Sequence, residues 1–374
     1  MSKKIFIHVG PPKTGTSAVQ KWFSDNTKLL SKEGVYYPSH DVDQNGVSSG
    51  NVSLLYDVNN EKQIELNQER LEKLLTEFEN SEFQTLFLSS EFFFRAMLEL
   101  KSHIPQAKFI AYVRNPMEIK ESSYNQSVKR HFQKQILNAG RSKRLPFMDR
   151  FVNFKNQYGT DDLVLRLYGA KYFKYGNIVS DILHIFGIEF NVDLPLVNSS
   201  YQFEALEFKR WLNQFELEKH QVVVDRALQA YKSGTASYSL ISTEQYIDDN
   251  LHYSKVIEGY ALELETDNLA PLVSDMKNVK TKNYLVQKLD EKSFRSVCDF
   301  LQSTLKVDYY LLIQDVKNSE PKQGDEYYQI FINSCEDKYK FIHLHMLIQS
   351  KVKRLINSLK RRIKFSVKFF YGNK

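Results

Sequence analysis

The chain has 374 residues, 42% of them hydrophobic and 26% charged, a composition typical of a globular protein and not of a fibrous or disordered one. No apolar run reaches the roughly 18 residues of a membrane-spanning helix, and the N-terminal apolar run is too short for the core of a signal peptide. The net charge of +6 comes from residues 351–374, which hold nine of the 51 basic side chains and no acidic one, so the body of the chain offers no general case for nucleic-acid binding. We therefore expect a cytoplasmic protein.

The first 200 residues alternate between strand-like and helix-like segments. In chain order the patterns predict a strand at residues 4–9, a helix at 16–30, a strand at 34–38, a helix at 67–79, a strand at 85–89, a helix at 91–100, a strand at 108–113, a helix at 117–137, a strand at 162–168 and a helix at 178–186. Strands that alternate with helices predict an α/β fold, with a P-loop-like parallel sheet flanked by helices. In such sheets ligands bind beyond the carboxyl ends of the strands.

The second half of the chain is predicted to be largely helical. We expect one domain over residues 1–315, with nucleotide-binding motifs in 1–200 and a helical, acceptor-side region in 201–315. Residues 318–325 (NSEPKQGD) indicate a linker, so 316–374 form a linker and a C-terminal helix. Cys298 and Cys335 lack metal-ligand spacing and are expected to be unpaired thiols in a reducing compartment.

The most informative motif is the loop of residues 10–17 (GPPKTGTS), between the first predicted strand and the first predicted helix. Its glycines let the backbone wrap an anion, and the free N–H groups at the helix start point toward it. The candidate phosphate ligands are Pro12, Lys13, Thr14, Gly15, Thr16 and Ser17. The Walker A pattern requires lysine directly after the second glycine, but here the lysine is Lys13 and Thr16 takes that place. That departure argues against an ATPase or a kinase.

The loop resembles the 5′-phosphosulfate loop of sulfotransferases, which use 3′-phosphoadenosine-5′-phosphosulfate (PAPS). The longer stretch HVGPPKTGTSAVQ looks like bacterial carbohydrate-type members of that family. The resemblance implies a sulfotransferase fold, PAPS as the sulfate donor without a metal ion, and a carbohydrate or glycolipid acceptor.

A second motif of that family is an Arg at a strand end followed eight residues later by a Ser, and the pair binds the 3′-phosphate of the nucleotide. Arg114 and Ser122 match this spacing after the strand at 108–113. An Arg at a strand tip can hold two phosphate oxygens, and a Ser two helical turns later can donate its hydroxyl. The Arg-Lys-Gly loop of cytosolic small-molecule sulfotransferases is absent from the sequence, which favours the carbohydrate branch.

Two residues are the candidates for catalysis. Lys13 is the expected partner of the leaving phosphate oxygen. Glu91 follows the strand at 85–89, in the region from which carbohydrate sulfotransferases commonly take a Glu or His base. The alternative for Glu91 is a helix N-terminal residue stabilised by the macrodipole. His40 and His131 are weaker candidates for the base, and His8 is expected to pack in the core.

The tail has a helical apolar stripe, Ile348, Val352, Leu355, Leu359, Ile363, Val367 and Phe370, interleaved with Lys and Arg. A basic amphipathic helix of this kind suits an anionic membrane surface, which predicts a peripheral location at the inner face of the cell membrane. The alternative is a helix that docks on the body or on a second subunit.

Overall fold

The computed structural model describes residues 3–11, 13–40, 49–59, 61, 63–138, 140–193, 200–319, 325–337 and 339–353. The chain divides into two compact units. Unit 1 comprises Met1–Tyr124, Leu137–Asn198 and Ser239–Tyr284, and unit 2 comprises Asn125–Ile136, Ser199–Tyr238 and Leu285–Lys374. Both units include residues of the predicted domain 1–315. The predicted boundary between residues 315 and 316 stays a prediction.

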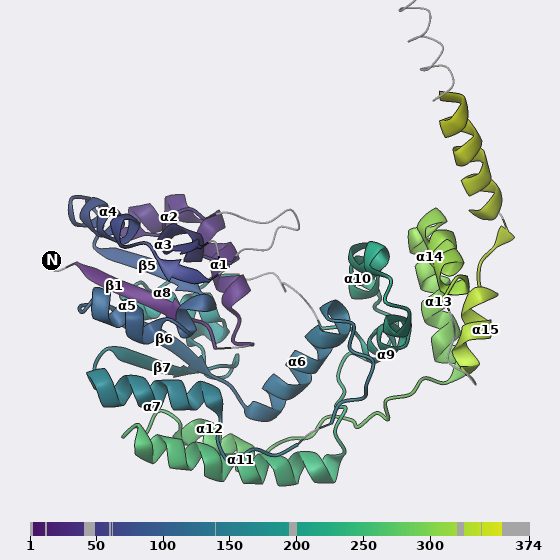
Figure 1. The fold of residues 1–374 in the computed structure, drawn as a ribbon. Coiled ribbons are helices and arrows are strands. Elements are labelled where there is room, and N and C mark those ends of the chain that lie inside the picture. Colours follow the sequence, from purple (N-terminus) through teal and green to yellow (C-terminus); the bar gives the residue numbers. More distant parts are fainter. Residues whose placement is uncertain are drawn as a thin grey trace, which may run out of the picture. The chain divides into compact units, whose positions relative to one another are not determined.

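Unit 1 is built on a five-stranded parallel sheet, which confirms the predicted α/β class (Figure 1). The strand order is β2-β5-β1-β6-β7. The strands are β1 (Lys4–Val9), β2 (Val35–Tyr36), β5 (Thr85–Ser90), β6 (Lys108–Val113) and β7 (Leu163–Leu167). Their near-continuous apolar sequences are explained by burial on both faces.

The two faces of the sheet belong to two separate hydrophobic cores, because side chains alternate along each strand. In β1, Ile5, Ile7 and Val9 lie in one core and Phe6 lies in the other. The first core includes side chains of α4 (Gln68–Glu79), α5 (Met97–His103), α7 (Pro146–Tyr158), α11 (Thr243–Glu263) and α12 (Ala270–Lys277). The second includes side chains of α1 (Thr16–Asp25), α2 (Thr27–Lys32) and α8 (Ile178–Phe186).

Two predicted helices differ from the observed ones for local reasons. The helix predicted at 16–30 is broken at Asn26, which has φ −117° and donates from its side-chain amide to the carbonyl of Trp22 at 2.8 Å. Asn competes in this way for backbone groups and favours helix ends. The helix predicted at 117–137 is α6 (Pro116–Arg130), and the chain soon turns at Phe132 with a φ of 50°.

Several smaller elements of unit 1 are absent from the sequence-based prediction. They are α7, the short helix α3 (Val52–Leu55), and the antiparallel pair β3 (Tyr56–Val58) and β4 (Ile64–Leu66). In place of the helix predicted at 91–100, a short 3-10 helix, η1 (Phe92–Phe94), precedes α5.

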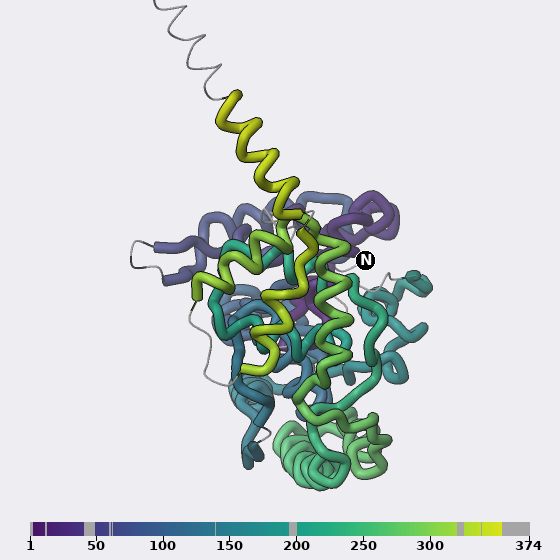
Figure 2. The backbone as a smooth tube through the Cα atoms, turned by 90° about the vertical axis from the view of Figure 1, so that its right-hand side faces the viewer, coloured from purple at the N-terminus to yellow at the C-terminus, as the bar shows by residue number. Residues whose placement is uncertain are grey.

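Unit 2 is helical in its described part, as the sequence predicts. Its helices are α9 (Phe203–Leu212), α10 (Gln221–Ala230), α13 (Glu291–Leu305), α14 (Val307–Lys317) and α15 (Glu326–Ile332), and Figure 2 traces the last three in green to yellow. Phe208, Trp211, Phe294 and Phe331 form an aromatic cluster among α9, α13 and α15, with ring centroids 4.9–5.9 Å apart. Residues 339–353 are helical, whereas residues 354–374, most of the predicted basic helix, lie outside the described residues. Among the helices described, none has both the length and the apolarity needed to cross a bilayer.

Candidate functional site

The loop of residues 10–17 joins β1 to α1, as the sequence predicts. Gly15 stands at the N-cap position of α1 with a φ of 80°, and it has no side chain with which to cap the helix. The first helical residues, 16–19 (TSAV), include no acid. Because the first N–H groups of a helix have no partner within the helix, this N-terminus is suited to an anion.

Lys13 has a φ of 67°, in the left-handed region that non-glycine residues rarely occupy. Such strain persists only where neighbouring contacts hold it. One such contact is the hydrogen bond from the Thr14 hydroxyl to the carbonyl of Pro11, at 2.6 Å. Thr14 is 1% exposed, so its hydroxyl serves the loop internally, whereas Ser17 is exposed. Pro12 lies outside the described residues.

Thr16 and Gly10 pack against each other beneath the loop. A Cβ at Gly10 would lie 1.9 Å from Thr16 Oγ1, so the hydroxyl occupies the space that a side chain at position 10 would need. Thr16 is 2% exposed, and its Oγ1 has no hydrogen-bond partner among the described residues. A buried hydroxyl without a hydrogen-bond partner normally destabilises the folded state. A ligand that rearranges the loop and gives this hydroxyl a partner would offset that cost.

Arg114 meets the loop from the neighbouring strand. The parallel register pairs His8 with Ile110, so β6 runs past the end of β1 and Arg114 stands level with the loop. Its Nη1 donates to the carbonyl of Lys13 at 2.9 Å. The strands that follow β1 in sequence, β2 and β5, lie on one side of it in the sheet. The strands β6 and β7 lie on its other side. This reversal of direction makes the carboxyl edge between β1 and β6 the expected ligand position in a sheet of this type.

Two further residues hold the guanidinium of Arg114, and sequence reasoning identified neither. Glu118, one helical turn into α6, accepts from Nε at 2.9 Å, and the Tyr168 ring lies 4.9 Å from the guanidinium carbon. Tyr168 also lies 3.1 Å from where a Cβ on Gly15 would be, so it contacts the loop as well. Nη2 has no hydrogen-bond partner among the described residues. The i, i+4 spacing of Arg114 and Glu118 was the signal available in the sequence.

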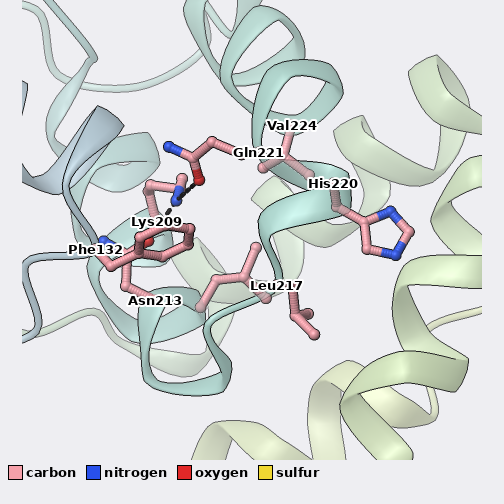
Figure 3. Close-up of a pocket in the computed structure, with 8 residues that line it drawn as sticks. Phe132, Lys209, Asn213, Leu217, His220, Gln221 and Val224 are labelled. Carbon is pink, nitrogen blue, oxygen red and sulfur yellow. Dashed lines mark hydrogen bonds between the residues drawn. The ribbon is translucent and has the colours of Figure 1, made fainter. Parts of the chain in front are cut away.

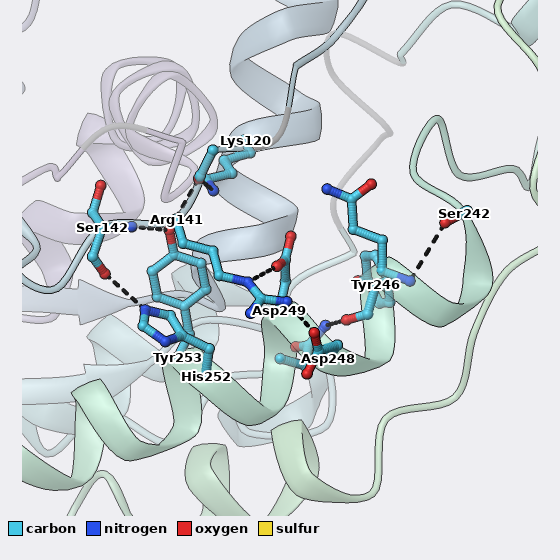
Figure 4. Close-up of polar contacts among 12 residues, drawn as sticks. Lys120, Arg141, Ser142, Ser242, Tyr246, Asp248, Asp249, His252 and Tyr253 are labelled. Carbon is cyan, nitrogen blue, oxygen red and sulfur yellow. Dashed lines mark hydrogen bonds and ion pairs between the residues drawn. The ribbon is translucent and has the colours of Figure 1, made fainter.

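Ser122 lies on α6 and is partly buried. The neighbouring residues of α6 are anchored within unit 1 (Figure 4). Glu121 accepts from the Ser239 hydroxyl at 2.6 Å, and the Lys120 ammonium lies 4.8 Å from the centre of the Tyr253 ring. These contacts anchor the turn of α6 that carries Ser122, and the pairing of Ser122 with Arg114 stays a prediction.

Glu91 follows β5 directly, and β5 lies beside β1. Partial burial of the Glu91 carboxyl group raises its pKa, while the nearby charge of Lys13 lowers it. Lys13 and Glu91 therefore share one end of the sheet. Glu91 precedes only the three-residue helix η1, and within the described part of the chain its side chain makes no capping hydrogen bond. A macrodipole role for Glu91 is correspondingly weak, because so short a helix has little dipole.

The histidines occupy three different settings. His8 is fully buried in the sheet, accepts or donates through Nδ1 to the Ser89 hydroxyl at 2.9 Å, and packs beside Phe87 and Tyr112, which confirms its core position. His40 interacts with the Tyr37 hydroxyl at 3.0 Å. His131 follows α6 and is exposed in unit 2.

A buried amine in unit 2 is a further titratable group that the sequence did not reveal (Figure 3). Lys209 is 2% exposed, contacts Asn213 and Gln221 through its ammonium, and burial lowers its pKa to about 8. The adjoining cavity of about 10 Å³ has room for a single water molecule, so the cluster is structural. Within the described ranges, no group of three or more His, Cys, Asp or Glu side chains is arranged to hold a metal ion.

Comparisons with known proteins assign no family to the chain. Neither a scan of protein-family models nor a search of curated proteins finds a match. The crystal structure of retinol dehydratase in complex with androsterone and inactive cofactor PAP aligns over 82% of this chain and 82% of its own, with 12% identity and a TM-score of 0.17. Similarity at that TM-score is too low to support a shared fold or function, and the α/β class rests on the observed sheet.

Proposed function

We propose that this chain is a PAPS-dependent sulfotransferase that modifies a hydroxyl group of a carbohydrate, such as a surface polysaccharide or a glycolipid. The observation that carries the proposal is the contact between Arg114 Nη1 and the carbonyl of Lys13. It joins two anion-binding features, the N-terminus of α1 and a guanidinium, at one edge of the sheet. A nucleotide with phosphate groups at both its 5′ and 3′ positions presents two separate anions to such an edge.

The residues of the loop fit a 5′-phosphosulfate. The N-terminus of α1 supplies N–H groups, Lys13 supplies a charge, and Thr16 supplies a buried hydroxyl without a partner among the described residues. Arg114 and Ser122 would hold the 3′-phosphate, and the Nη2 group of Arg114 is the donor with no described partner. When bound, PAPS supplies the sulfuryl group that is transferred.

The proposed catalytic roles are supported by the position of Lys13 and Glu91 at one end of the sheet. Lys13 would stabilise negative charge on the leaving phosphate oxygen, and positioning with electrostatics supplies most of the catalysis in the related phosphoryl transfers. Glu91 would accept the proton of the acceptor hydroxyl at its carboxylate. Burial raises the pKa of this carboxyl group toward that of a better proton acceptor, and the nearby charge of Lys13 opposes the shift.

The test is calorimetric titration of the whole chain with 3′-phosphoadenosine 5′-phosphate, followed by transfer of labelled sulfate from PAPS to a panel of glycans. We expect tighter binding of 3′-phosphoadenosine 5′-phosphate than of ADP, because only the former carries a 3′-phosphate. We expect Arg114→Ala to abolish that preference and Lys13→Ala to weaken binding of both nucleotides or to slow transfer.

Two other functions give different results in the same experiment. A P-loop kinase would bind ADP or ATP at least as tightly as the 3′-phosphorylated nucleotide, and the displaced lysine argues against it. A non-catalytic protein of the same fold, which binds at a membrane, would bind the nucleotide but transfer no sulfate to any glycan. Either result would refute the proposed activity.

A further inference from the structure

The helical segment at residues 339–353 exposes an unusual amount of apolar surface. Seven large apolar side chains within twelve residues are 43–66% exposed: Phe341, Ile342, Leu344, Met346, Leu347, Ile348 and Val352. Scattered exposed apolar residues are normal, but contiguous ones mark a surface for interaction. We call residues 341–352 the C-terminal apolar segment. Most of it lies upstream of the apolar stripe that the sequence predicted from Ile348 onward.

The charge of the surrounding chain is all of one sign. Residues 338–374 contain eleven Lys or Arg and no Asp or Glu. The body of the chain, in contrast, carries slightly more acidic than basic side chains. An apolar segment within a purely basic stretch is the combination that binds anionic lipid, because the apolar side chains enter the interface while the cations meet the headgroups.

A second copy of this chain is the other occupant to consider. Pairing two C-terminal apolar segments would bring their basic stretches together, with no acidic side chain in residues 338–374 to offset the repulsion. This repulsion disfavours self-association.

We propose that the C-terminal apolar segment is a membrane-docking element, which lies in the interface of an anionic bilayer while the basic residues around it bind lipid headgroups. The inference does not depend on the nucleotide chemistry of unit 1.

The test uses the full chain with vesicles of phosphatidylcholine, alone or mixed with phosphatidylglycerol. We expect the protein to sediment with the mixed vesicles at least about tenfold more strongly than with the neutral ones, and to lose binding as salt is raised. The variant Phe341→Ser/Ile348→Ser removes two apolar side chains seven residues apart, on one side of the helix, and should weaken binding by about tenfold or more.

Leu262→Ser is the matched control, because Leu262 is 81% exposed on α11, far along the chain from this segment. It should bind vesicles like the wild type. The variant Lys351→Gln/Lys353→Gln should weaken binding to the anionic vesicles and leave binding to the neutral vesicles unchanged. Equal thermal unfolding of all variants would show that the exposed substitutions leave the fold intact.

Three results would overturn the proposal. The first is the absence of vesicle binding by the wild type, and the second is equal binding by Phe341→Ser/Ile348→Ser and the wild type. The third is a dimer in sedimentation velocity that the same double variant dissociates, which would assign the segment to a second copy. None of these results bears on nucleotide binding, which the titration of unit 1 tests separately.

Discussion

Glu91 and Lys13 lie at the carboxyl ends of neighbouring strands, close enough for the charge of Lys13 to act on the Glu91 carboxyl group. Lys13 lowers the pKa of Glu91 against the larger opposing effect of burial. Removing the negative charge should therefore leave Lys13 as an anion ligand while it removes the proposed base.

For Glu91→Gln we expect nucleotide binding to be retained and sulfuryl transfer to slow by about 10²-fold or more, because proton removal in the transition state is lost. Calorimetry and a single-turnover assay measure the two quantities separately. Glu72→Gln on the exposed face of α4 is a control that should change neither. Near-normal turnover of Glu91→Gln would remove Glu91 from the mechanism.

Glu118 occupies one side of the Arg114 guanidinium, where a phosphate would also bind. The guanidinium is already held by the Lys13 carbonyl and the Tyr168 ring, so orientation does not depend on Glu118 alone. The Glu118 carboxylate would repel a phosphate dianion bound to Arg114. The Glu118 side chain is 44% exposed, which allows it to move away from the phosphate.

We expect Glu118→Gln to bind 3′-phosphoadenosine 5′-phosphate several-fold more tightly than the wild type, with a smaller change for ADP. Titrations at low and high salt would show the electrostatic origin, since screening should shrink the difference. Weaker binding by Glu118→Gln would mean that the carboxylate positions Arg114 and does not compete for it.

At the scale of elements, β1, the loop and α1 form one strand–loop–helix structure that depends on the contact between Gly10 and Thr16. Three atoms of Thr16 lie within about 3 Å of the position of a Cβ on Gly10. No small shift of Thr16 relieves all three contacts, because its backbone belongs to the first turn of α1.

Gly10→Ala should destabilise the protein by about 1–3 kcal/mol through overpacking. Thr16→Ala removes the clashing γ atoms, so the double variant Gly10→Ala/Thr16→Ala should recover part of that loss. Urea unfolding of the wild type, the two single variants and the double variant gives the free energies of a double-mutant cycle. Additive effects in the cycle would contradict the proposed contact.

At the scale of the whole molecule, the buried imidazole of His8 makes stability depend on pH. Desolvation lowers the pKa of His8 from 6.5 to about 3, so the folded protein keeps the ring neutral where the unfolded chain protonates it. Below pH 6.5 the unfolded chain binds the extra proton, and the free energy of unfolding falls as pH decreases toward 3.

We expect this single group to remove about 5 kcal/mol of stability across that window. The measurement is urea unfolding from pH 7 to pH 3 for the wild type and for His8→Asn. The difference between the two pH profiles isolates the contribution of the histidine. Parallel pH profiles for both would show that the pKa of His8 is the same in the folded and the unfolded protein. An NMR titration of the His8 ring in the folded protein provides an independent readout.

Local signals in the sequence were sufficient for much of the fold. The bounds of β1, β6 and α8 are those predicted, and α8 ends at Gly187, which has a φ of 88°. Helix α7 was predictable from Pro146 at its start and the apolar spacing of Met148, Phe151 and Phe154, which the prediction overlooked. The β3–β4 pair offers only three residues per strand, too few for a periodic signal.

By itself, the sequence determined that a glycine-rich loop with Lys13 joins a buried strand to a helix, and that Arg114 follows a later strand. These are local patterns, and short-range sterics and hydrogen bonding are enough to form them. Only the tertiary structure decided that Arg114 contacts the Lys13 carbonyl, that Glu118 and Tyr168 hold its guanidinium, and that Glu91 lies near Lys13. Those contacts depend on strand order and register, which are set by how the two cores bury both faces of the sheet and not by the sequence around any one residue.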